Sequence, residues 1–390
     1  MACILFAWEL GAGYGHAHRM AQVARRLAAM GHRLVTVTQN PDLMRRAFTG
    51  LDATMEPAPT SPVPEIPAGF ADSYAELLLR CGFADPADIG TRLTEWAALF
   101  ARHRPDLVIT DFAPTAMLAA RRAGLTVAAV ENGYSLPPRQ DPLPFTRAWE
   151  VPPPDRLRTL DDTARRAINQ ALAAQGDAPL DSLAALFDVA APILCTVPEL
   201  DHYQDRGPAD FFGPIYAQDT GVAPGWPQAP GPRVFAYLDT AHPTYAPTLH
   251  ALAQKGWPTV LHARGAGGAP ASSTLRCHAE PVQMDLALAQ CDIVVCQGLA
   301  TVSAALLAGR PIVQMPGHLE QTMVLHRVVV QGLGVGVLRE AGHEHVAAAL
   351  DLVRSDPGYA SRARAFADRY HGFSSADASQ AVAADCAALL

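Results

Sequence analysis

The glycine-rich segment GAGYGHAHR at 11–19 contains two histidines, His16 and His18, whose type suits acid–base chemistry. The segment follows an apolar run at 2–8, which is typical of a strand buried on both faces. A histidine titrates near neutral pH, so its neutral imidazole can take a proton from a hydroxyl group. We therefore consider His16 a candidate general base, with a packing or helix-capping histidine as the alternative.

A carboxylate stands in a comparable place in a later strand. Asp111 lies at the carboxyl end of the strand expected over 105–112. A base histidine generally needs a partner that fixes its tautomer and stabilises the imidazolium, and we expect Asp111 to be that partner. The alternative is an N-cap, because an acid after a strand often caps the next helix. Glu9, in the sequence WELGAG, either contacts a substrate near His16 or holds the glycine turn.

The second half of the chain contains a strand, a glycine turn and a helix in close succession. The strand is IVVC at 293–296, followed by Gln297 and Gly298, and the helix is expected to begin near Ala300 with Thr301 in its first turn. The free amides and the dipole at such a helix N-terminus favour an anion. This turn is therefore a candidate diphosphate site, although a strand–glycine–helix unit alone occurs throughout α/β proteins.

Polar residues are expected at neighbouring strand ends. Glu320 and Gln321 are predicted in the loop after the next strand, where they can accept and donate hydrogen bonds to sugar hydroxyls. Thr240 follows an earlier strand, where its hydroxyl can meet a phosphate. Arg264 ends the strand after that one and is a candidate counter-charge for a diphosphate.

Strands alternate with helices along the chain, which predicts parallel sheets with helical crossovers. The 390 residues allow about two domains of 150–200 residues each. We expect an α/β fold with two doubly wound, Rossmann-like domains facing a central cleft, with ligands beyond the carboxyl ends of the strands. The expected parts are an N-terminal domain at 1–215, a linker at 216–232, a C-terminal domain at 233–365 and a C-terminal helix at 366–390 that packs back on the N-terminal domain.

The composition excludes several classes of protein. A hydrophobic fraction of 49% with 17% charged residues excludes intrinsic disorder, and no apolar run reaches the roughly 18–20 residues of a membrane span. The formal charge is -8 and no basic stripe is visible, which argues against nucleic-acid binding. Lys255 is the sole lysine, which excludes a GxxxxGK[ST] phosphate loop and leaves little room for Schiff-base chemistry.

The cysteines and the start of the chain indicate a compartment. Seven cysteines without a CxxC pair favour reduced thiols over a disulfide framework or a zinc site. The sequence MACILFAWELGAG has no basic n-region of a signal peptide. We therefore expect a cytoplasmic protein. No metal site is expected, because the HxH pairs at 16/18 and 343/345 lack further ligands at suitable spacing.

The stretch from 281 to 336 resembles the donor-binding signature of GT-B glycosyltransferases of the UDP-glycosyltransferase and MurG-like type, HGGxGTxxEALxxGxPxxxxPxxxDQ. The upstream Val282 and Gln283 are similar to the family's PQ segment, whose backbone contacts the base. The resemblance implies that a nucleotide-sugar donor is bound by Val282, Gln283, Cys296, Gly298, Ala300, Thr301, Glu320 and Gln321. Aligned without a gap, and with Glu320 in place of aspartate, the matching positions are Gly298, Thr301, Ala305, Leu306, Gly309, Pro311, Pro316 and Gln321.

The stretch GAGYGHAHRMAQVARRLAAMGHRLVTV at 11–37 resembles the family's glycine-rich loop, GGxGHxxPxxxLAxxLxxxGHxVxF. His16 falls on the histidine that is the general base on the acceptor hydroxyl in many inverting members, and Asp111 matches the aspartate that pairs with it. Arg19 replaces a proline found in many members. The candidate acceptor-binding residues are Glu9, Gly13, Tyr14 and Asn132.

Two departures from the signature concern the nucleotide. Cys296 stands where the family has the histidine that contacts the diphosphate, and Ala304 stands where it has the glutamate that binds both ribose hydroxyls. Charge-assisted hydrogen bonds of this kind contribute on the order of 1.5–3 kcal/mol each. Their loss favours a deoxyribose donor such as a dTDP-sugar, or a weakened donor site.

The resemblance implies an inverting, metal-independent glycosyltransferase of natural product or glycoconjugate biosynthesis. It would move a sugar from a dTDP- or UDP-sugar to a hydroxyl or similar nucleophile of a small-molecule or peptide acceptor, with no cofactor besides this co-substrate. A catalytically silent homologue that binds or activates a partner, and a sugar-nucleotide epimerase, are the alternatives. The sequence names neither the acceptor, the sugar nor the oligomeric state, and we expect acceptor specificity in the proline-rich loops at 56–70 and 134–160.

Overall fold

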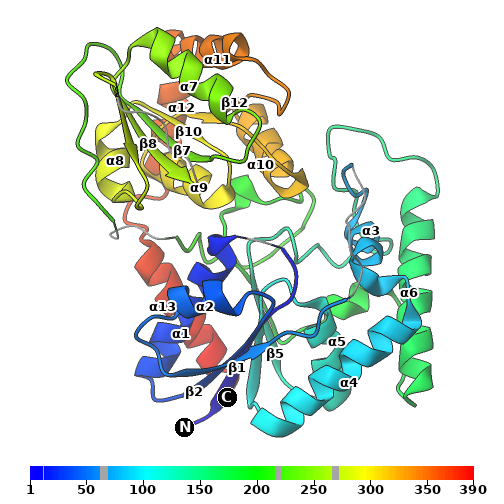
Figure 1. The fold of residues 1–390 in the computed structure, drawn as a ribbon. Coiled ribbons are helices and arrows are strands. Elements are labelled where there is room, and N and C mark those ends of the chain that lie inside the picture. The colour runs from blue at the N-terminus through cyan, green and yellow to red at the C-terminus, as the bar shows by residue number, and fades with distance from the viewer. Residues whose placement is uncertain (12, 62–68, 217–220, 266–271) are drawn as a thin grey trace. The chain divides into compact units, whose positions relative to one another are not determined.

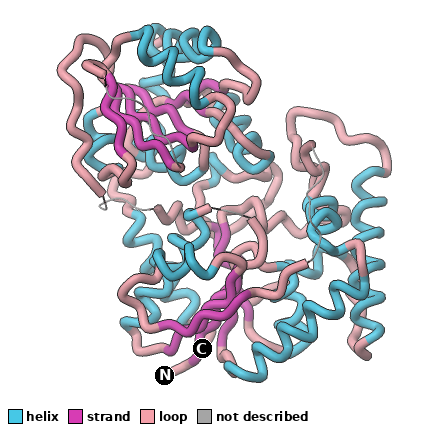
Figure 2. The backbone as a smooth tube through the Cα atoms, viewed as in Figure 1, coloured by secondary structure: helices cyan, strands magenta, loops and turns pink. Residues whose placement is uncertain are grey.

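The structure is a computed structural model that describes residues 1–11, 13–61, 69–216, 221–265 and 272–390. The chain divides into two compact units (Figure 1). Unit 1 consists of Met1–Ile215 together with Ala376–Leu390, and unit 2 of Tyr216–Ser375. Each unit has a central sheet with helices on both faces (Figure 2).

Unit 1 is built on a parallel sheet in the order β3-β2-β1-β4-β5-β6. Its strands contain four to six residues, and the central strands β1, β4 and β5 are buried along their whole length, as expected when helices cover both faces, whereas the edge strand β3 is half-buried or exposed. The strands are β1 (Cys3–Trp8), β2 (Arg33–Thr38), β3 (Ala53–Pro57), β4 (Leu107–Thr110), β5 (Val127–Glu131) and β6 (Ala191–Leu194). The α-helices are α1 (Tyr14–Ala29), α2 (Pro41–Ala47), α3 (Tyr74–Leu78), α4 (Pro86–His103), α5 (Pro114–Ala123), α6 (Arg156–Ala174) and α13 (Ser375–Ala387).

The strand order of unit 1 reverses between β1 and β4, since β2 lies on one side of β1 and β4 on the other. In Figure 1, α1, α2 and α13 lie on one side of this sheet and α4, α5 and α6 on the other. Ligands of open α/β sheets bind at such a reversal, beyond the carboxyl ends of the strands. The residues that follow β1 and β4 are therefore the natural place for a site.

Unit 2 repeats this topology with a parallel sheet in the order β12-β11-β10-β7-β8-β9. Its reversal lies between β7 and β10. The strands are β7 (Val234–Asp239), β8 (Thr259–Arg264), β9 (Leu275–His278), β10 (Ile293–Cys296), β11 (Ile312–Gln314) and β12 (Gly334–Gly336). The helices are α7 (Tyr245–Lys255), α8 (Met284–Gln290), α9 (Leu299–Leu307), α10 (Leu319–Val330), α11 (His343–Ser355) and α12 (Pro357–Arg369).

The predicted α/β class with two doubly wound sheets is confirmed, and most predicted elements are present within two residues. The helix over 114–123 is α5, and Gly31 follows α1 with a positive φ of 88°. One placement was wrong. Glu320 and Gln321 lie in the first turn of α10 rather than in a loop, where the acid interacts favourably with the helix dipole.

The segments around unit 2 differ from the expected parts. The described residues of the expected linker belong to unit 2. Within it, Val222 N–H donates to Pro281 O at 2.8 Å, and Val222 O accepts from Gln283 N at 3.0 Å. The expected boundary at 366 falls inside α12, because the chain turns at Gly372, with a positive φ of 85°, before α13 begins. Residues 62–68 of the expected acceptor loop and 217–220 of the linker lie outside the described residues.

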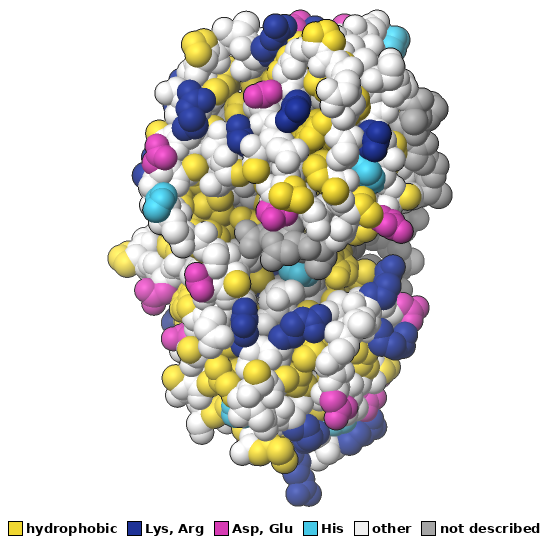
Figure 3. All heavy atoms as spheres, turned by 90° about the vertical axis from the view of Figure 1, so that its left-hand side faces the viewer, with side chains coloured by type: hydrophobic (Ala, Val, Ile, Leu, Met, Phe, Trp, Pro, Cys, Tyr) yellow, Lys and Arg dark blue, Asp and Glu magenta, His cyan; other side chains and the backbone are white. Residues whose placement is uncertain are grey.

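Three observations concern the classes of protein against which the composition argued, namely disulfide-bonded, nucleic-acid-binding and membrane-spanning proteins. All seven cysteines are free, as predicted. On the face shown in Figure 3, arginine and lysine side chains are interspersed with acidic ones. Among the described residues, no helix combines the length and apolarity needed to cross a bilayer.

Candidate active site

The start of α1 brings His16 to the carboxyl end of β1. The loop turns at Gly11, with φ +77°, and a Cβ there would lie 3.0 Å from His16 Nε2 and 2.9 Å from the Phe112 ring. Only glycine leaves room for the imidazole in this backbone conformation. The ring stacks on Trp8, with centroids 5.3 Å apart, and its side chain is 17% exposed.

Asp111 follows β4, the neighbour of β1, and its side chain is fully buried. His16 Nδ1–H donates to Asp111 Oδ1 at 2.8 Å. Because a carboxylate can only accept, this bond fixes the tautomer and leaves the lone pair of the ring on Nε2. The N-cap of α5 is Ala113 rather than Asp111. The predicted contact between these two residues is therefore present, and the capping alternative is not.

Arg19 binds the other oxygen of the same carboxylate. Its Nε and Nη2 donate to Asp111 Oδ2 at 3.0 and 2.5 Å. Burial alone raises the pKa of Asp111, but the Arg19 charge and then His16 outweigh it, so the pKa lies below its ordinary value. Asp111 is therefore ionised at neutral pH.

Phe112 completes the wall beside the imidazole. It has a left-handed backbone conformation with φ 52°, which is unusual for a bulky residue. Its N–H donates to Glu131 Oε1 at 3.0 Å, and its C=O accepts from Leu10 N at 2.9 Å. These bonds hold the strained backbone directly after Asp111, so the turn that aims the carboxylate is fixed from both sides.

Glu9 has a structural role rather than the predicted acceptor contact. The side chain is buried, and its carboxylate accepts from Thr115 N at 2.8 Å, Ala116 N at 3.1 Å and Trp96 Nε1 at 2.5 Å. It thus caps the first turn of α5 from the end of β1. The hydrogen bonds of Glu9 also do not support the alternative that it holds the glycine turn, because its partners lie in α4 and α5.

The burial of Glu9 makes the stability of the protein depend on pH. Burial raises the pKa of Glu9 to about 7, against the opposing effects of Arg92 and the hydrogen bonds. A raised pKa means that stability is fully present below the unfolded value and is lost as pH rises through the folded value. For Glu9 this loss accrues from about pH 4.5 to about pH 7 and amounts to about 3 kcal/mol.

The Glu9→Gln variant removes this titration. We expect the wild-type free energy of unfolding, measured by urea titration from pH 4 to pH 8, to fall relative to the variant as pH rises. The exposed Glu95→Gln in α4 is the matched control and should follow the wild type. Parallel pH profiles of wild type and Glu9→Gln would show that Glu9 titrates normally.

The other predicted acceptor residues surround the same loop. Gly13 precedes α1 with φ 110°, and Tyr14 begins the helix with 41% of its surface exposed. Asn132 follows β5, and its Oδ1 accepts from Tyr134 N at 3.1 Å. All three lie at the carboxyl edge of the sheet in unit 1, and their acceptor contacts stay a prediction.

In unit 2, the predicted donor residues lie at the carboxyl edge of the second sheet. Gly298 caps α9, and Thr301 is buried in the first turn. Gln297 is buried; its Oε1 accepts from Asp239 N at 3.0 Å, which joins the ends of β10 and β7 at the reversal. Its Nε2 has no hydrogen-bond partner among the described residues. A buried amide N–H group without a partner is available to an acceptor from a ligand.

The structure does not support the roles predicted for two donor residues, Cys296 and Arg264. Cys296 is fully buried at the end of β10, and burial raises its pKa well above the ordinary value, so the thiol cannot replace a diphosphate-binding histidine. Arg264 Nη2 donates to Asp239 Oδ2 at 2.6 Å, so its charge already has a partner. Thr240 lies beside this pair: its N–H donates to Arg264 O at 2.9 Å.

The first turn of α10 is tied to the α9 turn. Gln314 at the end of β11 donates through Nε2 to Gln297 O at 3.0 Å and to Gln321 O at 3.1 Å. Gln321 Oε1 accepts from Gly317 N at 2.8 Å, and its Nε2 lies 3.7 Å from where a Gly298 Cβ would be. Gln321 and Gly298, far apart in the signature, are therefore neighbours.

Of the remaining predicted donor residues, Ala300 is exposed in the first turn of α9. Val282 is buried, and Gln283 caps α8, with its backbone paired to Val222. Glu320 is half-buried beside Gln321. Ala304 is buried within α9, so that position offers no polar group.

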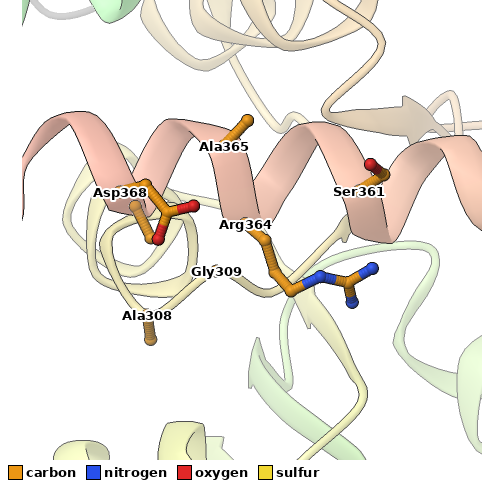
Figure 4. A pocket seen from close by; sticks show the side chains of 7 residues that line it. Ala308, Gly309, Ser361, Arg364, Ala365 and Asp368 are labelled. Carbon is orange, nitrogen blue, oxygen red and sulfur yellow. The ribbon is translucent and has the colours of Figure 1, made fainter.

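A hollow in unit 2 lies at the other end of α9. Figure 4 shows Ala308 and Gly309 facing Ser361, Arg364 and Asp368 of α12. These residues follow the last turn of α9, whereas Gly298 precedes its first turn. The hollow is thus separate from the donor-binding candidates, although Gly309 in its lining is one of the positions that match the signature.

Sequence reasoning missed several residues around His16 in unit 1. Arg19 had a signal, since residues three apart share a face of a helix and Arg19 is three after His16. Trp8, Phe112 and Glu131 had none beyond their place at strand ends. Among the described residues, no cluster of three or more His, Cys, Asp or Glu side chains is placed to hold a metal ion.

The sequence is similar to that of rhamnosyltransferases from Mycobacterium. It is 30% identical over 292 residues to the PGL/p-HBAD biosynthesis rhamnosyltransferase of Mycobacterium bovis (strain BCG / Pasteur 1173P2), over 68% of this chain. The chain spans 64% of the length of that relative. No protein-family model matches the sequence.

The fold is that of solved glycosyltransferases. The calicheamicin glycosyltransferase CalG4 aligns with a TM-score of 0.72 and 20% identity, over 100% of this chain and 98% of that one. The spinosyn rhamnosyltransferase SpnG complexed with thymidine diphosphate aligns with a TM-score of 0.64 and 17% identity, over 94% and 95%.

The protein has the GT-B fold, and the predicted resemblance to GT-B glycosyltransferases of the UDP-glycosyltransferase type is confirmed. Particular proteins to which the chain is similar are the mycobacterial rhamnosyltransferase in sequence and CalG4 and SpnG in structure. Each of these is a glycosyltransferase, which is the class of enzyme that the motifs predicted.

Proposed function

We propose that the protein is an inverting glycosyltransferase that moves a sugar from a nucleoside diphosphate to an acceptor hydroxyl or similar nucleophile. The observation that carries this proposal is the hydrogen bond of 2.8 Å between His16 and Asp111 at the reversal of the first sheet. It leaves Nε2 of a partly exposed imidazole as the proton acceptor. The relatives in sequence and structure are glycosyltransferases, which supports the same class.

The chemistry is a single displacement. His16 Nε2 takes the proton of the acceptor hydroxyl while the oxygen of that hydroxyl forms a bond to the anomeric carbon of the sugar. The bond from that carbon to the diphosphate oxygen breaks, and attack opposite the leaving group inverts the configuration. Asp111 keeps the Nδ1 proton in place and stabilises the imidazolium that forms.

The residues of unit 2 would bind the donor. The N-terminus of α9 after Gly298 would stabilise the negative charge that develops on the leaving diphosphate. The hydroxyls of Thr301 and Thr240 and the unpartnered Nε2 of Gln297 would donate hydrogen bonds to it. Glu320 and Gln321, in the first turn of α10, would bind hydroxyls of the sugar. This arrangement needs no metal ion, so turnover should survive EDTA.

A deoxyribonucleotide donor fits these residues best. Ala304 is apolar and buried, so the family's carboxylate contact to the ribose is missing. SpnG has been solved with thymidine diphosphate, and the mycobacterial relative is a rhamnosyltransferase. We propose a dTDP-sugar as donor, with dTDP-rhamnose first among the candidates.

Calorimetry with nucleoside diphosphates tests the ribose argument. UDP and 2′-deoxy-UDP differ by one hydroxyl, and the ribose hydroxyl has no carboxylate to bind here. We expect 2′-deoxy-UDP and thymidine diphosphate to bind at least as tightly as UDP. A tenfold preference for UDP, about 1.4 kcal/mol, would contradict the proposal.

A panel of dTDP- and UDP-sugars with candidate hydroxyl acceptors tests the function itself. The expected products are a nucleoside diphosphate and a conjugate of inverted anomeric configuration, identified by mass spectrometry and NMR. A free isomer of the sugar nucleotide would identify an epimerase. No binding of any nucleoside diphosphate at millimolar concentration would favour the silent, partner-binding homologue. A cytoplasmic location stays part of the proposal and is tested by cell fractionation.

A further inference from the structure

Arg19 takes a place next to the acid–base pair that the sequence signature gives to a proline. Its side chain is buried, with 6% of the residue exposed, and lies three residues after His16 on the same face of α1. Both of its bonds go to Asp111 Oδ2, while His16 holds Oδ1. With both oxygens bound from α1, the carboxylate cannot rotate away from the imidazole.

The groups that face Arg19 come from every neighbouring strand end. They are Asp111 after β4, Glu131 at the end of β5, Cys195 after β6, and His16 on its own helix. Burial, and then the charge of Asp111, raise the pKa of Glu131 well above its ordinary value. Burial raises the pKa of Cys195 to about 12.

Burial thus favours the neutral forms of Glu131 and Cys195, whereas Arg19 and His16 favour the ionised form of Asp111. Its single negative charge is compensated by the guanidinium of Arg19. Arg19 Nη2 also lies 3.5 Å from His16 Nδ1. An imidazolium at His16 would thus share the negative charge of Asp111 with Arg19, and it would lie close to the positive charge of that guanidinium.

We infer that Arg19 is a positioning residue of the acid–base pair: it locks the Asp111 carboxylate toward His16 and keeps the imidazole in its neutral, proton-accepting form. The inference rests on the proposed function, in which His16 takes the proton of the acceptor. A proline at this position would supply no such cation.

The Arg19→Met variant tests this by NMR titration of the histidine side chains. The His16 signal is assigned by its loss in His16→Ala. A like charge at this distance shifts a titration by about one unit or more. We expect the His16 midpoint, and with it the acidic limb of kcat/KM, to move up by about one pH unit in Arg19→Met. An unchanged midpoint and limb would overturn the inference.

Two further variants separate charge from orientation. Arg19→Lys keeps the charge but cannot bind one oxygen through a planar fork, so we expect a near-native midpoint with lower turnover. Arg45→Met removes an exposed arginine of α2 and should leave both unchanged. If Arg19→Lys moved the midpoint as far as Arg19→Met, the charge argument would be wrong.

The test does not require that the Arg19→Met variant folds, and it does not require an assay of turnover. If Arg19→Met fails to fold, the same shift is expected when Arg19→Met is added to Asp111→Asn, and its absence there would overturn the inference. The NMR titration needs no substrate. Full turnover in His16→Ala would overturn the proposed function alone, whereas an unmoved His16 titration in the Arg19 variants would overturn this inference alone.

Discussion

Turnover in His16→Ala is expected to fall by about 10²–10⁴-fold, the usual contribution of a general base. The physical reason is that Asp111, the acid beside His16, cannot take over the role of the base. Asp111 is fully buried behind the imidazole, and its two oxygens are occupied by His16 and Arg19. Donor binding should be nearly unchanged, because the donor candidates lie in unit 2. Single-turnover kinetics and calorimetry with thymidine diphosphate measure the two effects separately.

The matched control for this variant is His32→Ala. His32 stands just beyond the other end of α1, where its Nδ1 accepts from Ala2 N at 3.3 Å. We expect it to retain wild-type turnover. If His16→Ala turned over like His32→Ala, the base would have to be another group and the mechanism would fall.

The Asp111→Asn variant should lose about 10²–10⁴-fold in turnover. The asparagine keeps the size of the side chain, but its amide can donate to the imidazole and so favour the wrong tautomer. The imidazolium of the transition state would also lose its anion. A steady-state pH profile measures the effect, and the loss should persist at every pH at which the protein is folded.

This variant should still fold, for a reason found in the buried cluster. Replacing one member of a buried pair usually leaves an uncompensated charge. Here the charge of Asp111 is one cause of the raised pKa of Glu131, and Arg19 lowers that pKa. Burial is the larger cause, but the loss of the Asp111 charge should lower the pKa of Glu131, whose carboxyl faces Arg19 and can compensate its charge. Asp106→Asn, at the amino end of the same strand, is the control and should leave turnover unchanged.

Much of the fold could be predicted from local pattern. Buried parallel strands appear as short apolar runs, and glycine and proline mark where helices begin and end, as Gly31, Gly309 and Pro114 do. The sequence was weaker where the pattern was short or irregular. It missed β3, β6, β9 and β12, which contain three to five residues each, and it placed Glu320 and Gln321 in a loop instead of α10.

The candidate site, like the fold, could be predicted from the sequence only in part. The motif positions of His16, Asp111 and Gly298 were visible because each directly follows an apolar strand, and parallel strands bring their carboxyl ends to one edge. The signature also implied a donor role for Cys296, and the position at a strand end suggested one for Arg264, yet the thiol is buried and the guanidinium is paired with Asp239. A motif gives the type of residue at a position but not how far its side chain is covered.

By itself, the sequence determined the alternation of strands and helices, the two sheets and the chain positions that reach their carboxyl edges, because these depend on residues close together along the chain. Only the tertiary structure decided which side chains contact one another across the fold. Arg19 and Asp111 are 92 positions apart, and Glu9 reaches the first turn of α5 across more than 100. Such contacts depend on how helices dock on a finished sheet, so their hydrogen bonds and charges exist only once the chain has folded.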